Sequence, residues 1–172
     1  VPKQLLNLFS MALKSLTLSK FQITWLVVLR VAVGWHFLYE GLVKVLNPNW
    51  SSIGYLLDSK GFLAPFFYSL TANPTILSIA DFMNQWGLVL IGLGLILGAF
   101  TKIAAYSGML LLAFYYLSHP PFTGITFAMP TEGNYFLVDK VFIEFCALAV
   151  VTVFPTGNNI GLDRFFKKNK NY

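Results

Sequence analysis

FQITWLVVLRVAVGWHFLYEGLVKVL, from Phe21 to Leu46, is an apolar stretch long enough to cross a bilayer as one helix. It nevertheless contains four ionisable residues, Arg30, His36, Glu40 and Lys44. At about 100° per residue, these side chains fall within one arc of about 120°. Ionisable groups at membrane depth are costly and usually face protein or a wet cavity. The stretch therefore predicts a membrane helix with one polar face, which is the first place to look for function.

The composition indicates an integral membrane protein. The chain has 172 residues, of which 56% are hydrophobic and 11% are charged, and its mean hydropathy is +0.66. A soluble domain carries about a quarter charged residues. The simplest interpretation is one membrane domain over residues 1–172. The net charge is +5, but no basic stripe interleaves with aromatic residues, which argues against a nucleic-acid partner.

Four apolar stretches are each long enough to span the bilayer. They cover about 24–46, 77–100, 102–118 and 136–154. The turn near 99–102 is tight, so the second and third spans must be antiparallel neighbours. We therefore predict an all-α fold, an integral membrane four-helix bundle. Gly94 and Gly98 form a GxxxG pattern, which permits close approach of two helices.

The segments between the spans have their own patterns. Residues 1–20 have apolar side chains at helical spacing and predict an amphipathic helix in the membrane interface. The first long loop, 47–76, is rich in aromatic residues and predicts one or two short helices that cover the bundle, with a break at Lys60-Gly61 and an end at Asn73-Pro74. The second long loop, 119–135, is predicted to be irregular, and residues 155–172 form a basic tail.

The basic residues predict the orientation. By the positive-inside rule, the side that holds most Lys and Arg residues is cytoplasmic. On one side would lie Lys3, Lys14, Lys20, Lys102, Arg164, Lys167, Lys168 and Lys170. Only Lys44, Lys60 and Lys140 would lie at the other side. Both termini are thus expected in the cytoplasm and both long loops outside.

The last span carries a second pair of charges, Lys140 and Glu144. Four residues of helix rise about 6 Å. On this count Lys44 and Lys140 share one depth, Glu40 and Glu144 share the next, and His36 lies beneath them. If the first and last helices touch, crossed Glu–Lys pairs are the cheapest way to hold these charges.

A purely structural interpretation stays open. Glu40–Lys44 and Lys140–Glu144 are both i,i+4 pairs that can simply neutralise each other, and both lysines can snorkel to lipid headgroups. Arg30 lies deeper and favours a tie between helices. His119, before two prolines, is expected to be exposed at the outer surface.

The residues present in the sequence argue against several cofactors. The lone cysteine, Cys146, excludes an internal disulfide, a CxxC pair and a four-thiolate iron–sulfur site. Haem is disfavoured because His36 is expected to be deep and His119 to be at a helix end. No flavin or metal site is evident.

Several segments resemble one membrane family. The run Arg30-x-x-x-GWHFLYEG-x-x-Lys44 is similar to the first helix of the DoxX family, and of its DoxD-like branch especially. GLVLIGLGLILGAFTKIAAYSG, residues 87–108, looks like that family's second and third helices with their short basic turn. EGNY at 132–135 and FPTG at 154–157 also match. Many members carry a glutamate before the second-helix glycines, but this chain has Asn84-Gln85-Trp86 there, so no role of that glutamate is carried over.

The resemblance implies small four-helix membrane proteins, related to the membrane subunit of a thiosulfate:quinone oxidoreductase, with redox or thiol-handling partners. It leads us to expect a bacterial cytoplasmic (inner) membrane location and a protein partner at the outer face. Oxidation of a small sulfur compound rests on the resemblance alone.

Two functions compete, and whether the chain is an enzyme subunit stays open. The first is a subunit of a quinone-linked redox complex. In it His36 and Glu40 are catalytic, Trp35 and Tyr39 contact the quinone, and a partner supplies electrons. The supporting charges are Lys44, Lys140, Glu144 and Arg30. The alternative is a non-catalytic membrane anchor or assembly subunit that docks a partner through the outer loops. A transporter is disfavoured, because no inverted halves with broken helices are visible.

Overall fold

The structure is a computed structural model that describes residues 18–129 and 136–168. This part contains seven α-helices and one short 3-10 helix, and it has no strand. The helices are α2 (Lys20–Val45), α3 (Ile53–Leu57), α4 (Ala64–Thr71), α5 (Pro74–Leu97), α6 (Thr101–Ser118), α7 (Lys140–Val153), η1 (Thr156–Asn158) and α8 (Asp163–Lys168). The interfacial helix predicted over residues 1–20 falls almost wholly outside the described residues, as do residues 130–135 of the second loop.

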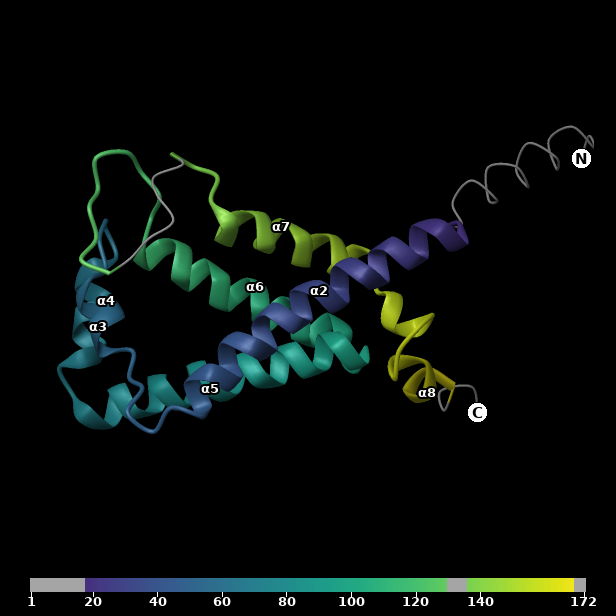
Figure 1. The fold of residues 1–172 in the computed structure, drawn as a ribbon, viewed down its shortest axis with the longest axis horizontal. Coiled ribbons are helices and arrows are strands. Elements are labelled where there is room, and N and C mark those ends of the chain that lie inside the picture. Colours follow the sequence, from purple (N-terminus) through teal and green to yellow (C-terminus); the bar gives the residue numbers. More distant parts are fainter. Residues whose placement is uncertain (1–17, 130–135, 169–172) are drawn as a thin grey trace, which may run out of the picture.

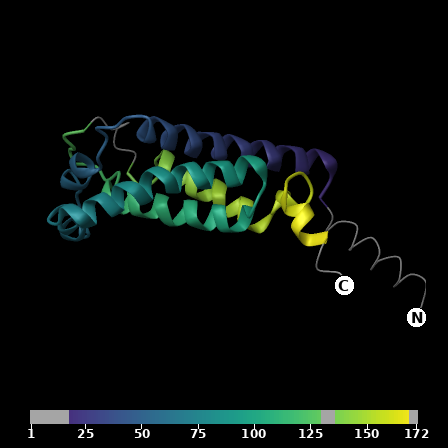
Figure 2. The ribbon, with the colours of Figure 1, turned by 90° about the horizontal axis from the view of Figure 1, so that it is seen from below.

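The four longest helices lie side by side. Helix α2 packs along α5, α5 against α6, α6 along α7, and α2 also touches α7 (Figures 1 and 2). The segment 47–73, which contains α3 and α4 and is called the lid below, lies across one end, the lid end. Helix α8 and the start of α2 lie at the opposite end, called the tail end (Figure 1). Helices α2 and α5 are long and apolar enough to cross a membrane. That all four helices cross, with cytoplasmic termini, stays a prediction.

Local signals in the sequence set the start of each helix. Ser19 and Gln22 form a reciprocal capping box at the start of α2. Asn73 caps α5, and Pro74 occupies its first position, where a missing N–H costs nothing. The predicted break in the lid is confirmed at Gly61, whose φ of +83° separates α3 from α4.

Helices α2 and α5 approach so closely that glycine is required between them. A Cβ atom on Gly92 would lie 2.5 Å from the backbone nitrogen of Leu38 and 2.7 Å from the carbonyl oxygen of Gly34. Within the GxxxG pattern, Gly94 faces α6 instead, where an added Cβ would lie 3.0 Å from the Cβ of Ala104. Gly98 instead ends α5 in the left-handed conformation, with φ of +64°.

Helix α7 is shorter than the predicted span of 136–154. It has 14 residues, which correspond to a length of about 21 Å. Asp139 caps its start by accepting from the Phe142 amide at 2.8 Å, and Phe136, with φ of +67°, has already turned the chain. The apolar core where α7 meets the other helices includes the buried side chains of Phe37, Leu95 and Leu148.

Candidate functional site

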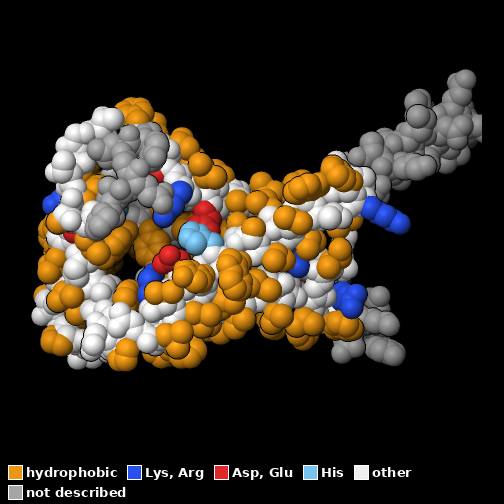
Figure 3. Space-filling view, viewed as in Figure 1, with side chains coloured by type: hydrophobic (Ala, Val, Ile, Leu, Met, Phe, Trp, Pro, Cys, Tyr) orange, Lys and Arg blue, Asp and Glu red, His pale blue; other side chains and the backbone are white. Residues whose placement is uncertain are grey.

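An acid–base pair joins α2 to α7. Nδ1 of His36 lies 2.7 Å from Oε1 of Glu144. The side chain of His36 is 45% exposed and that of Glu144 is 13% exposed, so the carboxylate is held by the protein while the ring stays accessible. In Figure 3 acidic, histidine and basic side chains gather at the edge of a hollow on this face. The sequence placed Glu144 level with Glu40, but its cross-helix contact is with His36.

Glu40 and Lys44 pair within α2 and not across the helices, contrary to the predicted crossed Glu–Lys pairing. Lys44 Nζ lies 3.7 Å from Glu40 Oε2. Lys44 also donates to Oδ1 of Asn84 on α5, at 3.3 Å. Its Nζ lies 5.4 Å from the ring centre of Trp50 and 5.7 Å from that of Tyr115. With 17% exposure, Lys44 is a largely enclosed cation that turns toward α5 and α6 instead of snorkelling outward.

Three further predicted site residues surround this group. Lys140 is the first residue of α7, one turn before Glu144. Trp35 and Tyr39 lie on the exposed surface of α2, at 60% and 57% exposure. They flank His36 in sequence and form an aromatic surface open to the surroundings of the helix.

Arg30 does not belong to this charge cluster. It is buried, and it donates to Oγ1 of Thr156 at 3.2 Å and to the carbonyl oxygen of Ile160 at 2.8 Å. Both partners follow α7 at the tail end. Arg30 therefore ties α2 to the segment around η1, which matches the structural interpretation of its sequence position and corrects its grouping with Lys44 and Glu144.

A second polar group lies beneath the lid, around His119 and Asp58. The His119 ring stacks between Tyr55, with centroids 3.9 Å apart, and Phe127, at 4.6 Å. Nδ1 of His119 lies 3.0 Å from Oγ of Ser118, and its Nε2 lies 4.0 Å from Oδ2 of Asp58. The side chain is only 11% exposed, so the expectation of an exposed His119 was wrong. Stacking of its ring between two aromatic residues removes it from solvent.

The Asp58 carboxylate joins the two long loops. It accepts from the backbone amides of Ala128 at 3.0 Å and Met129 at 2.9 Å. These amide donors hold the pKa of Asp58 below its ordinary value. Burial lowers the pKa of His119, although the nearby Asp58 charge acts in the opposite direction. The pair is thus set up as a carboxylate beside a neutral imidazole.

Sequence reasoning missed this second group because its members lie far apart in the chain. Asp58 binds amides about 70 residues later, and each residue has ordinary neighbours in its own loop. Side-chain to backbone contacts between loops leave no periodic pattern. The one available signal was the acidic residue just before the Lys60-Gly61 break.

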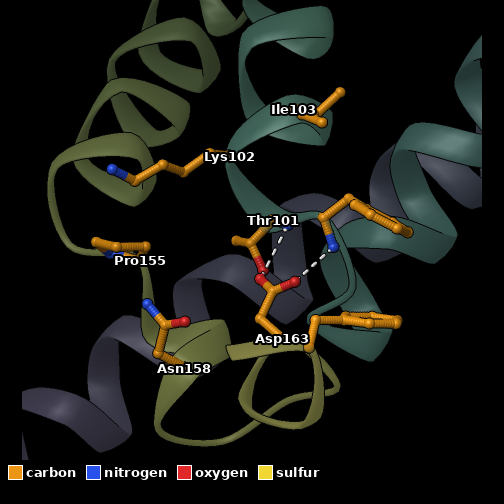
Figure 4. A pocket seen from close by; sticks show the side chains of 8 residues that line it. Thr101, Lys102, Ile103, Pro155, Asn158 and Asp163 are labelled. Atoms are coloured by element: carbon orange, nitrogen blue, oxygen red, sulfur yellow. Dashed lines mark hydrogen bonds between the residues drawn. The ribbon is translucent and has the colours of Figure 1, made fainter. Parts of the chain in front are cut away.

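A shallow pocket of about 330 Å³ lies at the tail end, next to the start of α6 (Figure 4). Asp163 points into this corner and accepts from the backbone amides of Phe100 at 2.6 Å and Thr101 at 3.1 Å. A helix N-terminus attracts anions, but here the chain's own carboxylate already occupies it. The two hydrogen bonds that Asp163 accepts hold the segment after α7 against the start of α6.

The side chains of this site can exchange protons. Within residues 18–129 and 136–168, no three His, Cys, Asp or Glu side chains converge to form a metal site. His36 with Glu144 is the group that combines a titratable ring, a carboxylate partner and an accessible face.

Comparison with known proteins gives one match. The family model for DoxX matches residues 25–120, which include most of α2 and all of the lid, α5 and α6. The curated proteins and the solved structures gave no match.

Proposed function

The chain belongs to the DoxX family, and on that premise we propose that it is the membrane subunit of a quinone-linked redox complex. It is an integral membrane protein, and the resemblance to this family favours a place in the bacterial cytoplasmic membrane. Reduction of a quinone consumes two electrons and two protons. The chain's own share of that reaction is to bind the substrate from the bilayer and to supply or receive protons.

The contact between His36 and Glu144 carries the proposal. The 2.7 Å hydrogen bond engages Nδ1, so Nε2 is the ring atom that can exchange a proton with a substrate oxygen. Glu144 fixes the ring and stabilises its protonated form. The 45% exposure of His36 keeps that nitrogen within reach of a molecule dissolved in lipid.

The neighbouring residues support this role in different ways. Glu40, 50% exposed and one turn from His36, is the group that passes protons between the ring and water. Lys44 lies 3.7 Å from the Glu40 carboxylate, and Lys140 places a second positive charge one turn before Glu144. Trp35 and Tyr39 offer the aromatic surface along which a quinone ring approaches.

In this proposal the electrons come from a partner protein with its own redox centre. The sequence has a single cysteine, Cys146, and among the described residues no three His, Cys, Asp or Glu side chains group as metal ligands. The lid and the second loop, on the side predicted to be outer, are the docking surfaces for this partner. Oxidation of a small sulfur compound by the complex extends the family resemblance.

The test is quinone reduction by the complex copurified from native membranes. His36→Gln is expected to lower turnover about 100-fold or more, because a positioned acid–base group contributes about 10²–10⁴. Glu144→Gln should lower it comparably, while Glu40→Gln should have a smaller effect. The matched control is His119→Gln, the same change at the buried histidine beneath the lid, which should leave turnover at neutral pH intact. Full turnover of the assembled His36→Gln complex would refute the proposal.

The second candidate is a non-catalytic anchor or assembly subunit. The observation that favours it is Phe62, an aromatic side chain in the lid that is 81% exposed. If Phe62→Ala abolishes copurification of the partner while His36→Gln leaves turnover unchanged, the chain is an anchor.

A further inference from the structure

The lid and the second long loop are joined at a polar junction, and the proposed function gives no role to its titratable groups. From the lid, the Asp58 carboxylate accepts from the backbone amides of Ala128 at 3.0 Å and Met129 at 2.9 Å. Asp58 is 7% exposed, and these partners lie 70 and 71 positions later in the chain. Hydrogen bonds to an ionised acceptor are about twice as strong as neutral ones. This one carboxylate therefore fastens the two loops to each other.

His119 lies inside the same junction. Its ring stacks on Tyr55 of the lid, with centroids 3.9 Å apart, and on Phe127 of the second loop, at 4.6 Å. Its Nδ1 lies 3.0 Å from Oγ of Ser118, and the side chain is only 11% exposed. The imidazole is thus part of the surface through which the two loops contact each other, so a change in its charge acts on both.

The enclosed Nε2 of His119 cannot form a hydrogen bond as a donor in this arrangement. In the described part of the chain, no hydrogen bond uses this atom. The Oδ2 atom of Asp58 lies 4.0 Å away, which is beyond hydrogen-bond distance, and it already accepts from the Met129 amide. A buried cation without a hydrogen-bonded partner is costly. To bind the protonated ring, the carboxylate must leave its amides or the ring must leave the stack, and either movement breaks the junction.

Among the described residues, two charged groups face His119, and both belong to the lid. The Asp58 carboxylate favours the protonated ring, whereas the Lys60 ammonium, 3.9 Å from Oδ1 of Asp58, opposes it. Helix α6 contributes the neutral hydroxyl of Ser118, and the second loop contributes the neutral ring of Phe127. Burial is the largest influence, so the pKa of His119 lies below its ordinary value.

From this geometry we propose that the junction is an acid-sensitive clasp, which is closed while His119 is neutral and which releases the lid from the second loop on acidification. The inference goes beyond the proposed redox function and does not depend on it. In the open junction the ring is hydrated and has an ordinary pKa of about 6.5. As the pH falls below that value, the open junction binds the proton first, and the closed junction loses stability. Both loops lie on the side predicted to be outer, so the clasp responds to acid outside the cell.

The test is amide hydrogen exchange at Ala128 and Met129 in the full chain in nanodiscs. Each rate is expressed as protection relative to an unstructured peptide at the same pH, which removes the direct effect of pH on exchange. Proton binding by the open junction should lower protection by up to about 10-fold between pH 7.5 and 5.5. A change of less than about twofold would overturn the proposal.

Two matched variants assign the effect to His119. His119→Phe keeps an aromatic ring in the stack but cannot bind a proton, so its protection should be equal at the two pH values. His36→Phe makes the same change at the chain's other histidine and should keep the full response. A response that persists in His119→Phe refutes the clasp. If His119→Phe does not fold, His119→Gln carries the same expectation and the same refutation.

The amide of Leu112, in the buried core of α6, separates local opening from unfolding of the whole bundle. If the clasp opens by itself, Ala128 and Met129 are less protected than Leu112 at both pH values. Equal protection at all three amides would show that the loops separate only when the bundle unfolds, and the clasp would be refuted. Quinone reduction by the His36→Gln complex tests the proposed function alone, so the two can fail separately.

Discussion

Replacement of Gly92 by alanine should force α2 and α5 apart. The new Cβ would lie 2.5 Å from the Leu38 nitrogen, whereas ordinary contact begins at 3.4 Å, a difference of 0.9 Å. The obstructing atoms belong to the backbone of α2, so no side-chain rotation can relieve the clash. Overpacking of this kind costs about 1–3 kcal/mol.

Gly87 provides the matched control for this substitution. It lies in the same helix, and a Cβ added there meets nothing within 4 Å. Alanine is the better helix former by about 1 kcal/mol at either position. That gain cancels when the two variants are compared, and only the clash remains. Gly92→Ala should therefore be less stable than Gly87→Ala by about 1–3 kcal/mol.

Unfolding by sodium dodecyl sulfate in mixed micelles, followed by far-ultraviolet circular dichroism, measures this difference. The Gly92→Ala curve should move to lower detergent fraction and the Gly87→Ala curve to the same or a higher fraction. Stabilities that agree within about 0.5 kcal/mol would show that α2 and α5 do not meet at Gly92.

Three further changes test other contacts. Asp163→Ala should lower the free energy of unfolding by about 1 kcal/mol and speed amide hydrogen exchange at Phe100 and Thr101, because it removes the acceptor at the start of α6. Unchanged exchange at these two amides would contradict the contact. Arg30→Lys keeps the charge but loses the bonds to its partners after α7, so unfolding should be easier by about 1–3 kcal/mol, and an unaltered curve would disprove the tie. Burial holds the pKa of His119 below its ordinary value of 6.5 in the folded chain. As the pH falls below about 6.5, the unfolded chain therefore binds the proton first, and the free energy of unfolding decreases until the pH reaches the folded pKa. His119→Gln should flatten this slope in unfolding measured from pH 7.5 to 5, and an identical slope would exclude His119 as its cause.

The helices and the lid were predictable because local patterns determine them. Apolar runs, the Asn73-Pro74 start and the break near Gly61 act over a few residues, and the structure has helices where these patterns indicate them. The start of α7 was less predictable, since the apolar residues before Lys140 look the same in sequence whether or not they are helical.

The candidate site was predictable only in part. The i,i+4 spacing of Glu40 and Lys44 sufficed for their pair. Counting residues along each helix placed Glu144 at the depth of Glu40, but Glu144 contacts His36. Which of the two residues it meets depends on how α2 and α7 cross, and the sequence does not give that angle. Arg30 bonds to residues 126 and 130 positions away in the chain, and Asp58 bonds to the second long loop. These tertiary contacts produce no periodic pattern in the sequence, so they could not be predicted from it.

The bond from Asp163 to the start of α6 also has a consequence for synthesis. The carboxylate comes 62 residues after Thr101 in the chain. While the ribosome is still making the intervening residues, the first amides of α6 lack this acceptor, so the α5–α6 hairpin exists in the growing chain before its last hydrogen bonds can form. A chain that is cut short before residue 163 would therefore leave the amides of Phe100 and Thr101 without the carboxylate that accepts from them in the full protein.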